Sequence, residues 1–298
     1  MTTLCLIKRN VKLFFRDKGM FFTALITPII LLVLYSTFLG KIYEDSFRLG
    51  LGGVSVSDAL MKACVGGQLI SSILAVSSVT VAFCSNMLMV QDKANGSAVD
   101  LVISPVKASS LSVAYYAATL ISTLLICFVA TILSLSYLAV VGWYLSIFDV
   151  LCLFLDVLLI VLFGTALSSV INFFLSTQGQ ISAVGSIVSS VYGFICGAYM
   201  PTSQFGDGLR TAISFLPGTY GTSLLRNHTL RGVFEAMESE GLSAEAVGEL
   251  RRVTDCELYF FETKVSIAAM FAVLLLSIAI LLGVYILLNV RKMKKTGR

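Results

Sequence analysis

Six long stretches of this chain carry almost no charge, and this feature limits the possible folds more than any other. Each stretch has about 20 or more residues, the length at which an α-helix crosses the hydrocarbon core of a bilayer. They are residues 20–39, 68–90, 111–141, 150–175, 181–200 and 265–288. The sequence therefore predicts an all-α integral membrane protein with six transmembrane helices, in a single domain over residues 1–298.

The composition supports this prediction and excludes other classes of protein. Hydrophobic residues make up 57% of the chain and charged residues only 13%, whereas roughly a quarter of the residues of a soluble domain are charged. Membrane lipid is therefore the expected surrounding. The net charge of +4 is small, so no nucleic-acid partner is expected.

Positive charges are spread unevenly over the predicted loops, and this predicts the orientation of the chain. Lysine and arginine in short loops resist translocation, so the side with more of them faces the cytoplasm. With the N-terminus inside, the inner side holds positions 8, 9, 12, 16, 18, 93, 107, 291, 292, 294, 295 and 298. The short outer loops hold only Lys41, Arg48 and Lys62. We therefore predict a multi-pass protein of the plasma membrane with both termini in the cytoplasm.

Residues 1–19 predict a helix that lies in the membrane interface ahead of the first span. Its apolar residues share one face and its basic residues lie beside them: Leu4, Ile7, Val11, Phe14 and Phe15, next to Lys8, Lys12 and Arg16. This pattern is typical of a helix whose apolar face enters lipid while its cations contact headgroups. A positively charged flank without a defined helix is the alternative.

The inner loop of residues 91–110 predicts a short helix outside the membrane. Asn95 and Gly96 favour a turn. Ser97 then suits a helix N-cap with Asp100 three residues further on, and Pro105 ends the helix. The helix carries four apolar residues with nothing evident in the chain to cover them, namely Val99, Leu101, Val102 and Ile103. Such a patch is typical of a contact with a partner protein.

Two series of small or hydroxyl-bearing residues indicate helix packing or a transport path. One recurs every four residues in the fifth stretch: Gly185, Ser189, Gly193 and Gly197. Small residues on one face let another helix approach closely, either within the chain or in a second subunit. The other recurs every seven residues in the second stretch: Ser71, Ser78 and Ser85. With Ser186, Ser190 and Tyr192 these hydroxyls suit the lining of a cavity for amphiphilic cargo, or they bond their own helix backbone.

Asp156 is the one formal charge within the six stretches. A carboxylate inside an apolar span is costly and often marks a path for ions or protons. A structural role, in which Asp156 pairs with a hydroxyl, a backbone group or a nearby cation, is the alternative.

Residues 201–264 form the predicted extracellular segment between the fifth and sixth spans. Its apolar pieces are too short to cross a bilayer and suit short helices that rest on, or dip into, the outer face. Residues 243–252 predict one amphipathic helix. The single histidine, His228, lies here, and we expect neither a carboxylate nor a serine set around it. Cys64 and Cys256 also fall on this side, where pairing is an option that the sequence alone does not establish.

The chain lacks the G-x-x-x-x-G-K-[ST] loop with which many proteins bind ATP. It also lacks a recognisable metal-ligand motif. We therefore predict that this chain is not an enzyme, has no catalytic residues, carries no cofactor or metal, and takes energy for any transport work from another polypeptide.

Several short motifs follow one another in a recognisable order along the chain. They are the basic helix of residues 4–18, the inner loop ending in Ser104-Pro105, Gly197-Ala198-Tyr199-Met200-Pro201, Phe215-Leu216-Pro217-Gly218-Thr219-Tyr220 and Leu224-Leu225-Arg226. In this order among six spans, the chain resembles the permease subunits of the bacterial type-2 ATP-binding-cassette (ABC) exporters.

The resemblance implies a permease that pairs with a second permease subunit, identical or paralogous, and recruits two separate ATPase subunits that bind ATP and Mg. Residues 97–104 would be the coupling helix seated in a cleft of the ATPase. The first, second and fifth spans would line the path, and closure of the ATPases would switch it between inward-open and outward-open states.

The 64 residues of the outer segment separate this chain from the polysaccharide-exporting members of that family, which have a short connection there. We therefore expect a drug, peptide or lipid-like cargo. Export of a surface glycan or teichoic-type polymer is the nearest alternative. An ion channel or ion-coupled carrier centred on Asp156 is an alternative from a different class.

Overall fold

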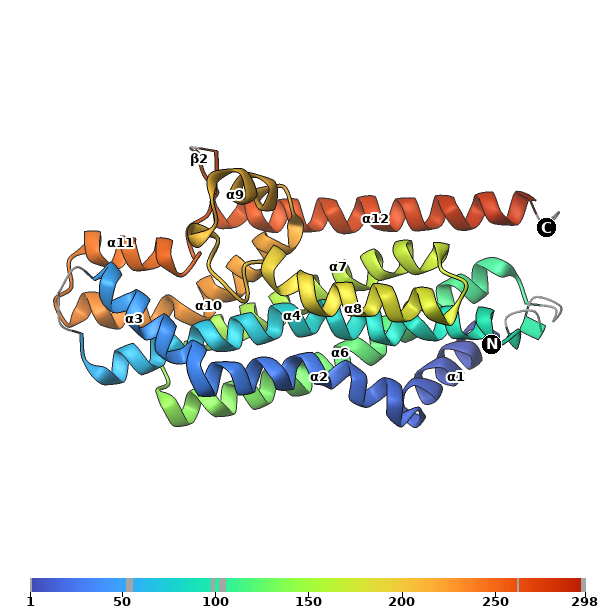
Figure 1. Cartoon of the computed structure of the whole chain (residues 1–298), viewed down its shortest axis with the longest axis horizontal. Coiled ribbons are helices and arrows are strands. Elements are labelled where there is room, and N and C mark those ends of the chain that lie inside the picture. The colour runs from blue at the N-terminus through green and yellow to red at the C-terminus, as the bar shows by residue number, and fades with distance from the viewer. Residues whose placement is uncertain (1, 52–55, 98–99, 102–105, 262, 296–298) are drawn as a thin grey trace.

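The computed structural model describes residues 2–51, 56–97, 100–101, 106–261 and 263–295 as a bundle of helices (Figure 1). The elements are α1 (Thr2–Arg16), α2 (Lys18–Leu34), the π-helix η1 (Tyr35–Leu39), α3 (Gly40–Gly50), α4 (Asp58–Ala94), α6 (Ala108–Val141), α7 (Ile147–Phe174), α8 (Gln178–Ile195), the 3-10 helix η2 (Thr202–Gln204), α9 (Asp207–Ser214), α10 (Pro217–Ser239), α11 (Ala244–Val253), β1 (Tyr259–Phe260), β2 (Thr263–Lys264) and α12 (Ile267–Lys295). The predicted all-α class is confirmed, because the only strands in the described part are these two-residue pieces.

Helix α4 is the centre of the bundle. Helices α2, α6, α7, α8 and α10 all pack against it, and 94% of its most apolar stretch is buried. The corresponding stretches of α6 and α12 are only 22% and 17% buried although they are more apolar. Apolar helix faces that protein does not cover are expected to contact lipid. Helices α6 and α12 therefore form much of the periphery of this chain.

Four described helices are long and apolar enough to cross a membrane, namely α4, α6, α7 and α12. A fifth crossing results if α1 and α2 count as one bent span, since their axes differ by 72°. The predicted span of residues 181–200 corresponds to α8, but α8 ends at Ile195. The multi-pass character is thus clear, whereas the count of six remains a prediction.

The bend between α1 and α2 follows from Asp17, whose side chain accepts a hydrogen bond from the Met20 backbone at 3.1 Å and caps α2. Helix α1 lies mainly against α6 and buries Leu6, Asn10 and Phe14. Leu4 is 72% exposed. Of the predicted apolar face of α1, Phe14 therefore contacts protein and Leu4 stays open, while Leu6 and Asn10 are buried although they lie outside that face.

The outer segment differs from the expected set of short surface helices. Helix α10 has 23 residues and packs against α4, α7 and α12. It approaches the α6–α7 connection closely at Gly232, where a Cβ atom would lie 1.8 Å from the carbonyl oxygen of Tyr144. The prediction of short helices on the outer face is therefore wrong for α10. A glycine at a close contact, such as Gly232, lets this partly polar helix enter the bundle. The predicted helix at residues 243–252 agrees with α11, which Ser243 caps.

The two ends of the bundle carry different parts of the chain. Helix α1 and the C-terminal end of α12 lie at one end, and α3 and α11 lie at the opposite end (Figure 1). Following the orientation predicted from the loop charges, we call these the inner and the outer end. The arrangement agrees with termini on the same side of a membrane.

Candidate functional site

A buried ion pair joins the outer segment to the membrane helices. Arg226 of α10 is 1% exposed, and its Nη1 donates to Oδ2 of Asp255 at 2.8 Å. Burial is the largest single influence and lowers the pKa of the guanidinium, but the Asp255 carboxylate and the other acidic groups around it together raise that pKa above its usual value. Arg226 is therefore charged. A buried charge is tolerated only when it is paired and hydrogen-bonded.

The remaining contacts of this pair lie on other elements. Nη2 of Arg226 donates to the carbonyl oxygen of Gly197 at 2.7 Å and to Oγ of Ser72 at 3.5 Å. Asp255 accepts from the backbone nitrogen and from Oγ1 of Thr202, at 2.8 and 2.7 Å. The pair thus connects α4, the end of α8, η2, α10 and the segment after α11. We call these residues the outer junction.

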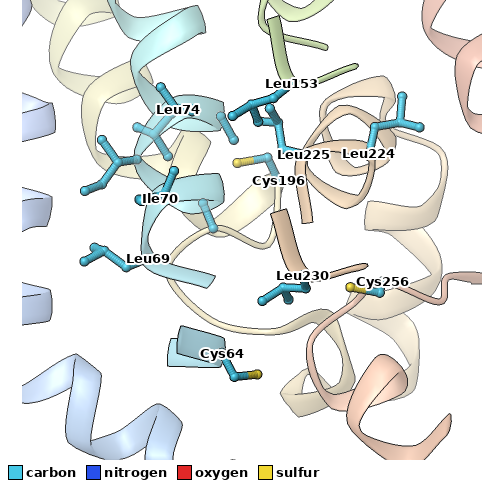
Figure 2. Close-up of a cluster of buried hydrophobic side chains, with 14 of the residues drawn as sticks. Cys64, Leu69, Ile70, Leu74, Leu153, Cys196, Leu224, Leu225, Leu230 and Cys256 are labelled. Atoms are coloured by element: carbon cyan, nitrogen blue, oxygen red, sulfur yellow. The ribbon is translucent and has the colours of Figure 1, made fainter. Parts of the chain in front are cut away.

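Apolar side chains surround the outer junction. Figure 2 shows Leu224 and Leu225, which precede Arg226 on α10, in one cluster with Ile70 and Leu74 of α4. Leu224-Leu225-Arg226 thus combines two core residues with one charged residue that fixes the outer segment.

Two stacked tyrosines attach the first span to the same region. The rings of Tyr35 and Tyr43 lie parallel with centroids 5.4 Å apart. Their hydroxyl groups donate to the carbonyl oxygens of Ala198, at 3.1 Å, and Tyr199, at 3.3 Å. Tyr35 begins the π-helix η1, a distortion that is often found at functional sites. The irregular part of the first span therefore contacts the segment Gly197-Ala198-Tyr199-Met200-Pro201.

Beside this contact, a groove of about 720 Å³ opens between the first span and α8. Its walls are mostly apolar, with a few hydroxyl and amide groups among them. The lining residues are Thr23, Ile26, Ile30, Leu34, Leu39, Ile42, Tyr43, Ser46, Ser189, Ser190, Phe194, Tyr199, Met200, Pro201 and Gln204. A groove of this size and character suits an amphiphilic molecule. We call it the α2–α8 groove.

The small residues of α8 have different surroundings. A Cβ atom at Gly193 would lie 2.2 Å from the ring of Tyr199, and one at Gly185 would lie 2.7 Å from Cε of Met87. Gly197 has a φ of +73°, a left-handed conformation that favours glycine. Gly185 and Gly193 therefore allow close packing within the chain and Gly197 allows the turn after α8, whereas Ser189 lines the α2–α8 groove.

The serines of α4 lie in the interior of the chain and do not line the groove. Ser71 and Ser78 are fully buried and donate to the carbonyl oxygens of Gln68 and Leu74 in their own helix. Ser85 is buried near the inner end without a hydrogen-bond partner among the described residues. A path along the α4 series is not evident in this single chain.

Asp156 has a partner that the sequence analysis missed. Oδ2 of Asp156 on α7 lies 2.5 Å from Nδ1 of His228 on α10, and both side chains are buried. The expectation that His228 has no carboxylate near it is therefore wrong. The two residues are 72 positions apart, and the unexpected burial of α10 brings them together. This contact supports the structural alternative for Asp156.

We expect Asp156→Asn to keep the fold, because an asparagine oxygen still accepts a hydrogen bond from His228. Asp156→Leu removes the acceptor and leaves His228 unpaired, which costs about 1–3 kcal/mol. Thermal unfolding of the purified protein measures the difference. If Asp156→Asn were as stable as the native chain but abolished transport, Asp156 would instead belong to a transport path.

At the inner end, two adjacent residues of α4 fix the stem of the loop of residues 91–110. Asp92 accepts from Nη1 of Arg9 on α1 at 2.9 Å and from the hydroxyl of Tyr115 on α6 at 2.6 Å. Lys93 donates to the last carbonyl oxygens of α7, those of Asn172, Phe173 and Leu175. Such contacts satisfy carbonyl groups that a helix end leaves free. The stem is thus tied to α1, α6 and α7.

The predicted coupling residues are only partly described. Gly96 has a φ of +80°, as the predicted Asn95-Gly96 turn requires. Ser97, Asp100 and Leu101 are helical, and Leu101 is half-buried. Val99, Val102, Ile103 and Pro105 lie outside the described residues.

Cys64 and Cys256 are both buried free thiols in the core cluster (Figure 2). The described residues also contain no group of three or more His, Cys, Asp or Glu that could hold a metal ion.

Comparison with known proteins identifies the family. A family model described as ABC-2 type transporter matches residues 2–229, from the first helix to the part of α10 that carries Arg226 and His228. A search of curated proteins finds no match. The family match spans well over half of the chain and includes the inner loop, the α2–α8 groove and the residues of the outer junction other than Asp255. The chain therefore belongs to the ABC-2 type transporter family.

Proposed function

We propose that this chain is the transmembrane subunit of an ATP-driven exporter of hydrophobic or amphiphilic molecules such as drugs, peptides or lipid-like compounds. The observation that carries the proposal is the α2–α8 groove. It is about 720 Å³ in volume and mostly apolar, and it offers the hydroxyls of Ser189 and Ser190 to a polar group. The first span and α8 form it, which agrees with a path along the first and fifth spans.

A second permease subunit, identical or paralogous, would cover the open side of the groove. Beside the lining residues, α2 carries exposed Ile29 and Val33, and α8 carries exposed Ile187 and Val191. These residues are apolar and lie beside the groove. Two such faces in contact would enclose one path between two chains, with membrane lipid around the remaining surface.

A separate ATPase would bind at the inner end. Permeases of this family generally work with an ATP-binding subunit, and that subunit would hold ATP and Mg. The coupling helix of residues 97–104 would transmit the movement of the ATPase to the permease. The bonds of Asp92 and Lys93 to three other helices supply a rigid connection from this loop to the bundle.

The orientation has a direct test. Cysteines at Ser109 and Ser239 are expected to react with a membrane-impermeant reagent from opposite sides, because the charge distribution places the first inside and the second outside. Both positions are exposed, and the exposed native Cys5 is replaced by serine beforehand. Reaction of both cysteines from the same side would contradict the proposed topology.

The groove has a test of its own. Ser190→Trp should fill part of it and weaken stimulation of ATP hydrolysis by amphiphilic fluorescent dyes at least about tenfold, since a lost contact of about 1.4 kcal/mol lowers affinity by that factor. Ser136→Trp, on the exposed side of α6, is the matched control and should have little effect. Equal dye stimulation in both variants would exclude the groove as the cargo site.

A further inference from the structure

A small cavity lies where α1, α4 and α6 meet near the inner end. The volume that the centre of a water molecule can occupy in this cavity is about 10 Å³. Asn10 comes from α1, Ser85 from α4, and Thr119 and Ser122 from α6, and Phe14 of α1 forms part of the apolar wall. The cavity is thus shared by three helices and is close to the minimum size that holds one water molecule.

Three polar atoms that line this cavity have no hydrogen-bond partner among the described residues. They are Nδ2 of Asn10, Oγ of Ser85 and Oγ of Ser122, and their side chains are 1%, 4% and 1% exposed. Buried polar atoms are nearly always paired, with protein or with ordered water. Three unpaired atoms from three different helices around one cavity indicate a shared bound partner.

The chemistry of the three groups restricts that partner. Oδ1 of Asn10 accepts from Nη1 of Arg9 at 2.8 Å, which fixes the orientation of the amide and leaves Nδ2 as a donor. The partner must therefore accept a hydrogen bond from Asn10, which a bare metal ion does not do. It must also be no larger than about one water molecule. Water accepts and donates two hydrogen bonds each, and it fits one amide donor and two hydroxyls.

We propose that this cavity is a binding site for one ordered water molecule that joins α1, α4 and α6. The water completes a polar network across the inner half of the bundle. On one side Asn10 continues through Arg9 to Asp92.

On the other side Thr119, which lines the same cavity, donates to Oδ1 of Asn86 at 3.4 Å. Nδ2 of Asn86 donates to the hydroxyls of Ser168 and Ser169 on α7, each at 3.0 Å. The network therefore runs from α1 to α7, next to the stem of the loop of residues 91–110. The site stands independently of the proposed export function.

Radiolytic hydroxyl-radical footprinting of the purified full-length chain tests this site, because radicals formed from bound water oxidise buried side chains beside it. Phe14 is expected to be oxidised faster than Phe83. The two rings are equally buried, at 1% and 2% exposure, but only Phe14 lines the cavity. Equal rates for Phe14 and Phe83 in the native chain would overturn the proposal, whether or not any variant folds.

Ser85→Val fills the cavity and should reduce the oxidation of Phe14 to the rate of Phe83. Ser78→Ala is the matched control on the same helix, since Ser78 bonds its own backbone and does not line the cavity; it should leave the rate of Phe14 unchanged. An unchanged, fast oxidation of Phe14 in Ser85→Val would mean that radicals reach the ring from elsewhere, and would also contradict the water site.

Discussion

Arg226→Met is expected to destabilise the outer segment by about 3–5 kcal/mol, because it removes one partner of a fully buried ion pair. Asp255 would keep its contacts with Thr202 but lose the positive charge beside it. The carbonyl oxygen of Gly197 would lose its donor as well. Thermal unfolding and limited proteolysis of residues 201–264 measure the loss.

Two controls show whether the effect of Arg226→Met comes from an unpaired charge and whether it depends on burial of the ion pair. Adding Asp255→Asn to Arg226→Met removes the unpaired charge and should restore part of the stability, since asparagine tolerates the positive φ of 55° at this position. Arg210→Met breaks an exposed pair with Asp207 and should cost less than about 1 kcal/mol. If Arg226→Met and Arg210→Met had equal effects, the outer junction would not hold the outer segment in place.

Leu101→Asp is expected to separate the permease from its ATPase while leaving the membrane helices folded. Leu101 lies in the loop of residues 91–110, outside the candidate membrane-crossing helices. In the proposed contact the new carboxylate would be buried without a partner. That burial costs several kcal/mol and weakens binding on the order of 100-fold or more. Co-purification of the ATPase and ATP hydrolysis by the complex measure the effect.

Ser109→Asp is the matched control for Leu101→Asp. It adds the same charge to the other end of the loop at an exposed position and should leave ATPase binding close to normal. If Leu101→Asp bound the ATPase as well as the control does, residues 97–104 would not be the coupling helix. A carrier that uses no ATPase would then gain support.

The membrane-crossing helices followed from the sequence because length and lack of charge determine which segments cross a bilayer. The predicted stretches of residues 68–90 and 111–141 lie within α4 and α6, and those of residues 150–175 and 265–288 extend beyond α7 and α12 by no more than two residues. The prediction of a span over residues 181–200 was less accurate, since α8 ends at Ile195. Its last residues instead form the irregular segment that contacts Tyr35 and Arg226.

The sequence did not predict the burial of α10, and the two buried charge contacts were missed with it. Residues 217–239 mix polar and apolar positions without a long uncharged run, so they indicated a surface segment. Their burial depends on close approach at Gly232 and on partners far away in the sequence. Arg226 finds Asp255, and His228 finds Asp156. An arginine directly after Leu224 and Leu225 was the one local signal for a buried ion pair.

Co-expression of this chain with a candidate ATP-binding subunit from the same organism, followed by affinity purification from detergent, tests the central claim most directly. The account predicts a stable complex of permease and ATPase subunits whose ATP hydrolysis depends on the permease and rises with amphiphilic dyes. A permease that purifies without any ATP-binding subunit, and that moves ions or solutes in reconstituted vesicles without ATP, would contradict the account.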